Sequence, residues 1–153
     1  MTNFHVRNIT LDDVPALIKL NEENIPEHYP VSVWNIHATV FNKVSFIALY
    51  QGELIGYILC IYDKTDLRQP HALITSFVVD KSVRRHGIGE ALLSVCIEKA
   101  SQVYADIRFI SLNVRVSNTA AIDLYKKKGF KVTGTEKEYY EDKENAFEMR
   151  RMV

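Results

Sequence analysis

The sequence predicts one α/β domain, spanning residues 1–153, in which a mixed β-sheet is flanked by about four helices. A length of 153 residues suits one domain with its own core. Hydrophobic residues make up 47% and charged residues 25% of the chain, which is typical of globular proteins. Strand-like and helix-like hydrophobic runs alternate, and no repeat or linker separates them.

The first quarter of the chain is predicted to form a strand and two helices. Apolar residues mark a short strand over Phe4–Ile9. A helix is expected over Thr10–Asn24, because Thr10 can cap its start and apolar residues recur at helical spacing. Two prolines between residues 25 and 30 end this helix, and a second helix is expected over Val31–Asn42.

The middle of the chain is predicted to form three strands and a long helix. The apolar runs Val44–Tyr50 and Leu54–Tyr62 are separated by a Gln-Gly-Glu turn, which predicts a hairpin. A third apolar run, Ala72–Val79, ends at an aspartate. After a glycine-containing turn over Lys81–Gly89, apolar residues at helical spacing predict a helix that runs to about Tyr104.

The last third is predicted to form a strand, a helix and two further strands. The apolar run Arg108–Val114 predicts the strand. A helix is expected over Ser117–Lys128, because Gly129 can end it in the left-handed conformation. Phe130–Lys137 and Ala146–Met152 are expected to be the last two strands.

Charge and cysteine content exclude several classes of function. Lys plus Arg and Asp plus Glu both number 19, so the basic excess of a nucleic-acid binder is absent. Cys60 and Cys96 lie in apolar runs and are expected to be reduced core thiols, with too few further ligands for zinc. No apolar run approaches the roughly 20 residues that span a bilayer, and Met1–Arg7 lacks the apolar core of a signal peptide. We therefore expect a cytoplasmic protein without nucleic-acid, membrane or metal partners.

The segment Val78–Leu93 combines a strand, a basic turn with two glycines, and a helix. The first N–H groups of a helix have no intrahelical partner and lie at the positive end of its dipole, so this place suits phosphate. A P-loop would need Gly-Lys-Ser/Thr, and a dinucleotide fingerprint would need a glycine where Leu92 stands. By themselves, these residues also fit an ordinary strand-to-helix turn.

Two motifs together resemble the GNAT acetyltransferases. The Arg-x-x-Gly-x-Gly motif of residues 84–89 follows a strand, like the acyl-CoA pyrophosphate loop of that family. The Asn-x-x-Ala-x-x-x-Tyr segment of residues 118–125 precedes Gly-Phe at 129–130, as in the family's later helix. The resemblance implies the GNAT acyl-CoA N-acyltransferase fold, with a mixed, largely antiparallel central sheet, and acetyl-CoA as cosubstrate.

Four further segments, residues 25–29, 111–118, 138–142 and 146–149, resemble one subgroup of this family, the ARD-type and RimI-type protein N-terminal acetyltransferases. This resemblance implies transfer of an acetyl group to the α-amino group of protein N-termini, by direct attack of the amine on acetyl-CoA. For the oligomeric state, it is compatible with either a monomer or a weak dimer.

The resemblance also assigns the residues that bind the cofactor. The end of the third central strand would pair with the pantetheine arm, and the basic turn would hold the pyrophosphate, with Glu90 acting through its main chain. The cofactor-binding residues so implied are Phe77, Val78, Val79, Arg84, Arg85, His86, Gly87, Ile88, Gly89, Glu90, Asn118 and Tyr125.

By the same resemblance, Glu27 is the general base, acting directly or through one water, and Tyr125 donates a proton to the leaving thiolate. Tyr140 binds the peptide backbone or helps to relay the proton. The residues expected to bind the substrate are Ile25, Tyr29, Asn113, Tyr139 and Tyr140. Relatives often carry His or Glu at the position of Asn113, and asparagine does not titrate, so this departure places more weight on Glu27. His28 is a rival base.

Two other functions stay open at this point. The chain could acetylate a small amine or a lysine side chain, or it could bind acetyl-CoA without catalysis. The Tyr139–Tyr140 pair and the loop at residues 25–29 argue against a small amine or a lysine side chain as the substrate. For single residues the alternative roles are structural: Tyr125 as a core tyrosine and Glu27 as a solvated carboxylate.

Overall fold

The computed structural model describes residues 3–153; Met1 and Thr2, part of the segment tested for a signal peptide, lie outside the described residues. The α-helices are α1 (Val14–Asn24), α2 (Val31–Thr39), α3 (Ile88–Val103) and α4 (Thr119–Lys127). The strands are β1 (His5–Asn8), β2 (Phe46–Tyr50), β3 (Glu53–Asp63), β4 (His71–Val79), β5 (Phe109–Arg115), β6 (Lys131–Glu136) and β7 (Ala146–Met152). Short 3-10 turns are η1 (Leu11–Asp13), η2 (Asn42–Val44) and η3 (Lys81–Val83).

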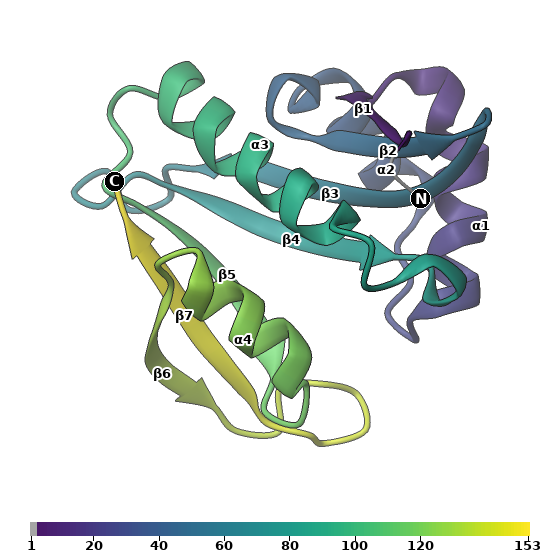
Figure 1. Ribbon diagram of the computed structural model, residues 1–153. Coiled ribbons are helices and arrows are strands. Elements are labelled where there is room, and N and C mark those ends of the chain that lie inside the picture. Colours follow the sequence, from purple (N-terminus) through teal and green to yellow (C-terminus); the bar gives the residue numbers. More distant parts are fainter. Residues whose placement is uncertain (1–2) are drawn as a thin grey trace. The chain divides into compact units, whose positions relative to one another are not determined.

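Within residues 3–153 the seven strands form a sheet in the order β1-β2-β3-β4-β5-β7-β6 (Figure 1). β4 and β5 run parallel, whereas β1–β2, β2–β3, β5–β7 and β6–β7 are antiparallel. The predicted mixed, largely antiparallel sheet with four helices is therefore confirmed. The chain divides into two compact units: unit 1 is Met1–Ile61 with Ser76–Val103, and unit 2 is Tyr62–Thr75 with Tyr104–Val153. The prediction that residues 1–153 form one domain stays a prediction.

Unit 1 buries both faces of its sheet, and β3 shows why. Six consecutive residues of this strand, 55–60, are buried, a pattern typical of a strand covered on both sides. Tyr57 and Leu59 belong to a core cluster with side chains of α1 and α2. Because side chains alternate along a strand, Gly56 faces the other side, where a Cβ atom would lie only 3.2 Å from Leu92 of α3.

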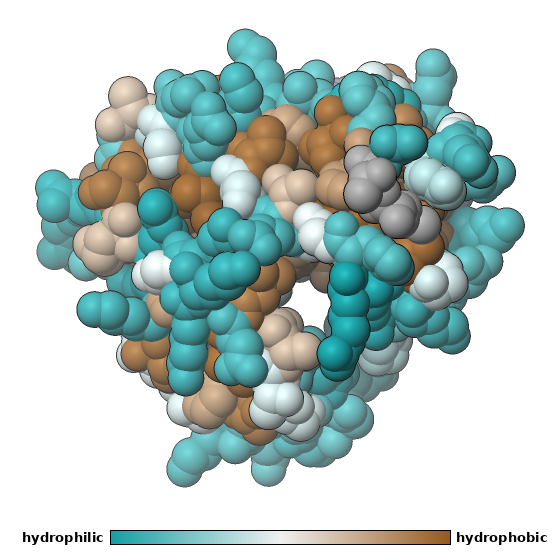
Figure 2. Space-filling model, viewed as in Figure 1, coloured by the Kyte–Doolittle hydropathy of each residue, from teal (hydrophilic) through white to brown (hydrophobic). Residues whose placement is uncertain are grey.

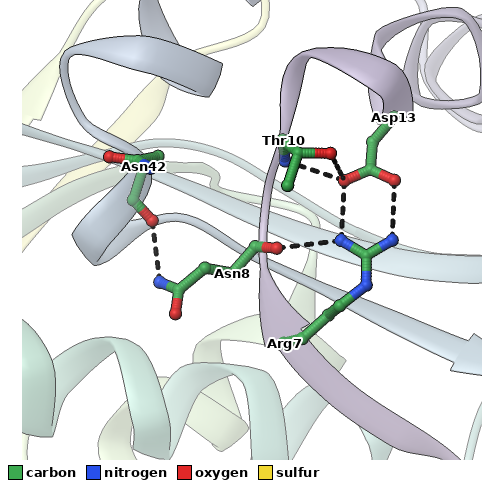
Figure 3. A network of polar contacts seen from close by, with 5 residues as sticks. All are labelled: Arg7, Asn8, Thr10, Asp13 and Asn42. Atoms are coloured by element: carbon green, nitrogen blue, oxygen red, sulfur yellow. Dashed lines mark hydrogen bonds and ion pairs between the residues drawn. The ribbon is translucent and has the colours of Figure 1, made fainter.

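The start of α1 differs from the prediction. Residues Leu11–Asp13 form the 3-10 turn η1, and the α-helix begins at Val14 rather than Thr10. The Thr10 N–H donates to Asp13 Oδ2 at 2.8 Å, and Arg7 donates to both Asp13 oxygens at 2.8 Å (Figure 3). The Arg7 guanidinium lowers the pKa of the Asp13 carboxyl. This charge-assisted pair holds β1 to the entry of the helix.

The ends of other helices and strands differ from the predicted ends by a few residues. The second helix ends at Thr39 and not at Asn42, since η2 follows. The predicted hairpin between β2 and β3 is present, with Gln51 and Gly52 as its two turn residues at φ 50° and 80°. Positive φ at both positions is the geometry of a type I′ turn, which matches the twist of paired strands.

Unit 2 is built around the β5–β7–β6 ladder. β5 pairs with β7 along its whole length, from Phe109↔Met152 to Arg115↔Ala146. α4 lies along β5 and β7 (Figure 1), and it buries Ile122 and Tyr125. Gly129, at φ 90°, ends the helix as predicted and leads into Phe130, which is 1% exposed.

Hydrophobic residues appear on the surface as separate patches between hydrophilic ones (Figure 2). Cys60 and Cys96 are both buried free thiols. Within residues 3–153, no helix has the length and apolar character needed to cross a membrane.

Candidate active site

The basic turn at the start of α3 is exposed and has the backbone geometry of an anion cradle. Arg84, Arg85, His86 and Gly87 are exposed, whereas Ile88 is only 1% exposed and anchors the first helical turn. Arg85 and Gly87 have φ values of 69° and 81°, and a Cβ on Gly87 would meet nothing within 4 Å. The main chain here can therefore approach a ligand closely, with two arginines beside it.

Hydrogen bonds within unit 1 hold the residues at the start of this turn in place. The Asp80 N–H donates to Ile55 O at 2.8 Å, and Arg84 Nε donates to Val79 O at 3.0 Å. The Asp80 carboxylate accepts from the Ser82 hydroxyl and, at 3.0 Å, from Asn24 Nδ2. These contacts, led by Ser82, lower the pKa of the Asp80 carboxyl, so its charge is well stabilised.

The strand that precedes the turn extends beyond its pairing with β5. β4 pairs with β5 from His71 to Ile74, and Phe77, Val78 and Val79 lie beyond that stretch. Val78 is 4% exposed, and its carbonyl oxygen would lie 3.1 Å from a Cβ on Gly56. The glycine thus permits the close packing of β3 against the end of β4 in unit 1.

The loop between α1 and α2 holds the candidate base. Ile25 and Tyr29 pack against the core cluster of unit 1, and the Tyr29 ring meets Trp34 edge-on at 5.9 Å. Between them, Glu27 is half-buried, and its carbonyl oxygen accepts a hydrogen bond of 3.0 Å from Asn21 Nδ2. His28, the rival base, is exposed, and its Nε2 lies 3.1 Å from Ile25 O.

In unit 2, Tyr125 is a buried phenol on α4. It is 7% exposed, and its ring meets Phe130 edge-on at 5.8 Å. Burial, with a smaller contribution from Tyr140, raises the pKa of Tyr125 well above its ordinary value. A phenol with a raised pKa keeps its proton and is a weaker acid than a thiol, whose pKa is about 8.5. This environment therefore suits hydrogen bonding to a departing thiolate more than complete proton transfer to it.

Three predicted substrate-binding residues lie together in unit 2. Asn113 Nδ2 lies 3.4 Å from the Tyr139 hydroxyl, and the Tyr139 and Tyr140 rings meet edge-on at 5.0 Å. Asn113 Oδ1 is buried and has no hydrogen-bond partner within residues 3–153. A buried acceptor is normally satisfied, so this oxygen marks a place for a donor from a ligand or a water.

Comparison with known proteins places the chain in a family. Residues 11–130 match the model of the acetyltransferase (GNAT) family. The chain belongs to this family. It is 37% identical to an N-alpha-acetyltransferase of Sulfurisphaera tokodaii, over 95% of this chain and 91% of that protein. It is 34% identical to the N-alpha-acetyltransferase daf-31 of Caenorhabditis elegans, over 96% and 81% of the two chains. The crystal structure of Ard1 from Thermoplasma volcanium superposes with a TM-score of 0.84 at 26% identity, covering 98% of this chain and 97% of that one.

These similarities confirm the predicted family, its fold and the enzyme class, and acetyl-CoA is the acetyl donor of the GNAT family. The roles of the individual site residues of this acetyltransferase stay predictions. Residues 3–153 contain no group of three or more His, Cys, Asp or Glu side chains that could hold a metal ion.

The sequence analysis missed Arg115 of this GNAT acetyltransferase. Its guanidinium lies 4.0 Å from the centre of the Tyr140 ring and donates to Asp142 and Glu144 at 2.9 Å. Glu144 also accepts from the Ser117 N–H at 3.0 Å. Arg115 therefore holds the loop that carries Tyr140 against the end of β5. The acidic residues of that loop, Asp142 and Glu144, were the sequence feature that could have indicated these ion pairs.

Asn118 has a structural role in addition to the predicted one. It is the N-cap of α4, and its Oδ1 accepts from the Ala121 N–H at 3.2 Å. Its contact with the cofactor stays a prediction. A second missed feature is the polar residue Asn21, which lies on the buried side of α1 beside Leu17 and Leu20.

Proposed function

We propose that this GNAT acetyltransferase transfers the acetyl group of acetyl-CoA to the α-amino group of protein N-termini. The observation that carries the proposal is the identity of 34% and 37%, over nearly the whole chain, to proteins named N-alpha-acetyltransferases. We propose further that it acts as a single domain in the cytoplasm, as a monomer or weak dimer, without metal, nucleic acid or membrane.

The acetyl donor is held by unit 1 residues with complementary chemistry. Phe77, Val78 and Val79 offer main-chain groups to the amides of the pantetheine arm. The main chain from Arg85 to Glu90, with Arg84 beside it, binds the pyrophosphate, because N–H groups and guanidinium groups both favour anions. The exposure of residues 84–87 supports this assignment. Asn118 adds a polar contact to the cofactor.

Transfer proceeds by direct attack. The amine nitrogen forms a bond to the thioester carbon, the carbon–sulfur bond breaks, and Glu27 takes the ammonium proton directly or through one water. Tyr125 donates a hydrogen bond, or finally a proton, to the thiolate. An α-amino group has a pKa near 8, against about 10.4 for lysine, so a carboxylate is a sufficient base. Cys60 and Cys96 are both 0% exposed, which argues against an acyl-enzyme.

The peptide is held by residues from three of the four segments that resemble the subgroup, residues 25–29, 111–118 and 138–142. Asn113 Oδ1 accepts from a peptide N–H or from an ordered water, which satisfies this buried acceptor. Tyr139 and Tyr140 bind the peptide backbone, and Tyr140 assists the proton relay. Ile25 and Tyr29 contact the first side chain of the substrate.

The test is an incubation of the purified chain with acetyl-CoA and peptides that begin with Ser, Ala, Thr, Met or an acidic residue. Release of CoA thiol, together with an acetyl group on the peptide α-amine, supports the proposal. Modification of lysine or a small amine alone would establish a different acetyltransferase. Binding of CoA with no turnover would establish a non-catalytic module, the outcome that the untitratable Asn113 favours.

A further inference from the structure

The last turn of α1 carries two asparagines that hold different loops of unit 1. Asn21 Nδ2 donates to Glu27 O at 3.0 Å and to the Tyr57 hydroxyl at 3.1 Å. Three residues later, Asn24 Nδ2 donates to Asp80 Oδ1 at 3.0 Å, and Asn24 Oδ1 accepts from the Lys81 N–H at 3.0 Å. One helical turn therefore contacts both the loop of the candidate base and the entry to the basic turn.

The Asn21 contact is part of a buried chain of hydrogen bonds. Asn21 is 1% exposed and Tyr57 is 0% exposed. The Tyr57 hydroxyl lies 2.9 Å from Ser76 Oγ. This hydroxyl accepts from Asn21, and either hydroxyl can donate in the bond between Tyr57 and Ser76. Burial raises the pKa of Tyr57 to about 12, so the hydroxyl keeps its proton, and Tyr29 and Glu27 add to the rise.

We propose that Asn21 and Asn24 are positioning residues that act on different steps. Asn21, supported by Tyr57 and Ser76, fixes the main chain of Glu27 and thereby the base. Asn24, through Asp80 and Lys81, fixes the entry to the turn that holds the pyrophosphate. This inference rests on the proposed function, in which Glu27 is the base and the turn binds acetyl-CoA.

The two asparagines serve as matched controls for each other. Asn21→Ala should lower kcat about tenfold and leave the KM for acetyl-CoA nearly unchanged. Asn24→Ala should raise the KM for acetyl-CoA, and the Kd for CoA measured by calorimetry, about fivefold or more, with kcat nearly unchanged.

A double-mutant cycle tests whether Asn21 acts through Glu27. In a Glu27→Gln background, Asn21→Ala should lower kcat no further, whereas Asn24→Ala should still weaken CoA binding by its full factor. Full additivity of Asn21→Ala with Glu27→Gln would overturn the positioning role of Asn21. Unchanged CoA affinity in Asn24→Ala would overturn that of Asn24.

Tyr57→Phe keeps the ring against Trp34, a contact of 5.5 Å, and removes the hydroxyl. It repeats the Asn21 test if Asn21→Ala does not fold, with the same expected loss of kcat and the same non-additivity. Failure of the proposed function appears differently, as no acetyl transfer by the unsubstituted chain. Failure of this inference appears as additive effects in an active enzyme.

Discussion

His37 should make the stability of the protein depend on pH. It lies on α2, is 3% exposed, and its ring is tilted against Phe41 with ring centres 6.1 Å apart. Burial lowers the pKa of His37 from 6.5 to about 4, while a hydrogen bond with the Cys60 backbone works in the opposite direction. The folded state therefore holds this imidazole neutral over a range in which the unfolded chain binds a proton.

The sign and size of the effect follow from that difference. Between pH 6.5 and about 4 the unfolded state binds one proton more than the folded state, so the free energy of unfolding falls as the pH falls. One pKa unit corresponds to about 1.4 kcal/mol, and the loss across this range should reach about 3 kcal/mol. Above pH 6.5, His37 should contribute no pH dependence.

Urea denaturation at a series of pH values measures this loss. The matched variant is His37→Gln, which can still donate to Cys60 O but does not titrate. The difference in stability between the two proteins should shrink or reverse by about 3 kcal/mol from pH 7 to pH 4. Parallel curves for the two proteins over this range would show that folding does not lower the pKa of His37.

Three further substitutions give separable results. Gly56→Ala should lower the free energy of unfolding in urea by about 1–3 kcal/mol, because its Cβ would lie 3.1 Å from Val78 O. Gly134→Ala, whose Cβ would have nothing within 4 Å, should leave it nearly unchanged. Equal effects of the two substitutions would contradict close packing at Gly56. Arg115→Ala should raise the KM for peptide about fivefold and leave the KM for acetyl-CoA unchanged. Arg150→Ala, which removes a similar cation–π contact with Phe109, should leave both KM values unchanged. The same shift in both variants would exclude a specific role of Arg115 in peptide binding. Tyr125→Phe should lower kcat about tenfold or more in a folded protein, and unchanged kcat would remove Tyr125 from the chemistry.

Periodicity and turn chemistry were enough to predict the elements and their order. β7 begins and ends at the predicted residues, Ala146 and Met152. The errors in the prediction lie at helix ends whose position is determined by tertiary contacts. α1 begins at Val14 because Asp13 binds Arg7 and Thr10 in a 3-10 turn, and no local rule ranks that arrangement above a helix starting at Thr10.

The candidate site was predictable where its chemistry is local. The basic turn at residues 84–89 carries its own signal in glycine and arginine spacing. The supporting contacts are not local: Asn21 and Tyr57 are 36 residues apart, and Asn24 and Asp80 are 56 apart. Asparagines on the buried side of an amphipathic helix were the available hint, but their partners depend on how the strands pair.

N-terminal acetylation is tested by locating the modified group on a peptide that has both a free α-amine and an internal lysine. After incubation with acetyl-CoA, fragmentation mass spectrometry should locate one acetyl group on the α-amine and none on the lysine, with one CoA thiol released per acetyl group. The same peptide with a blocked N-terminus should release no thiol. Acetylation of the lysine, or thiol release from the blocked peptide at the same rate, would contradict the proposed function.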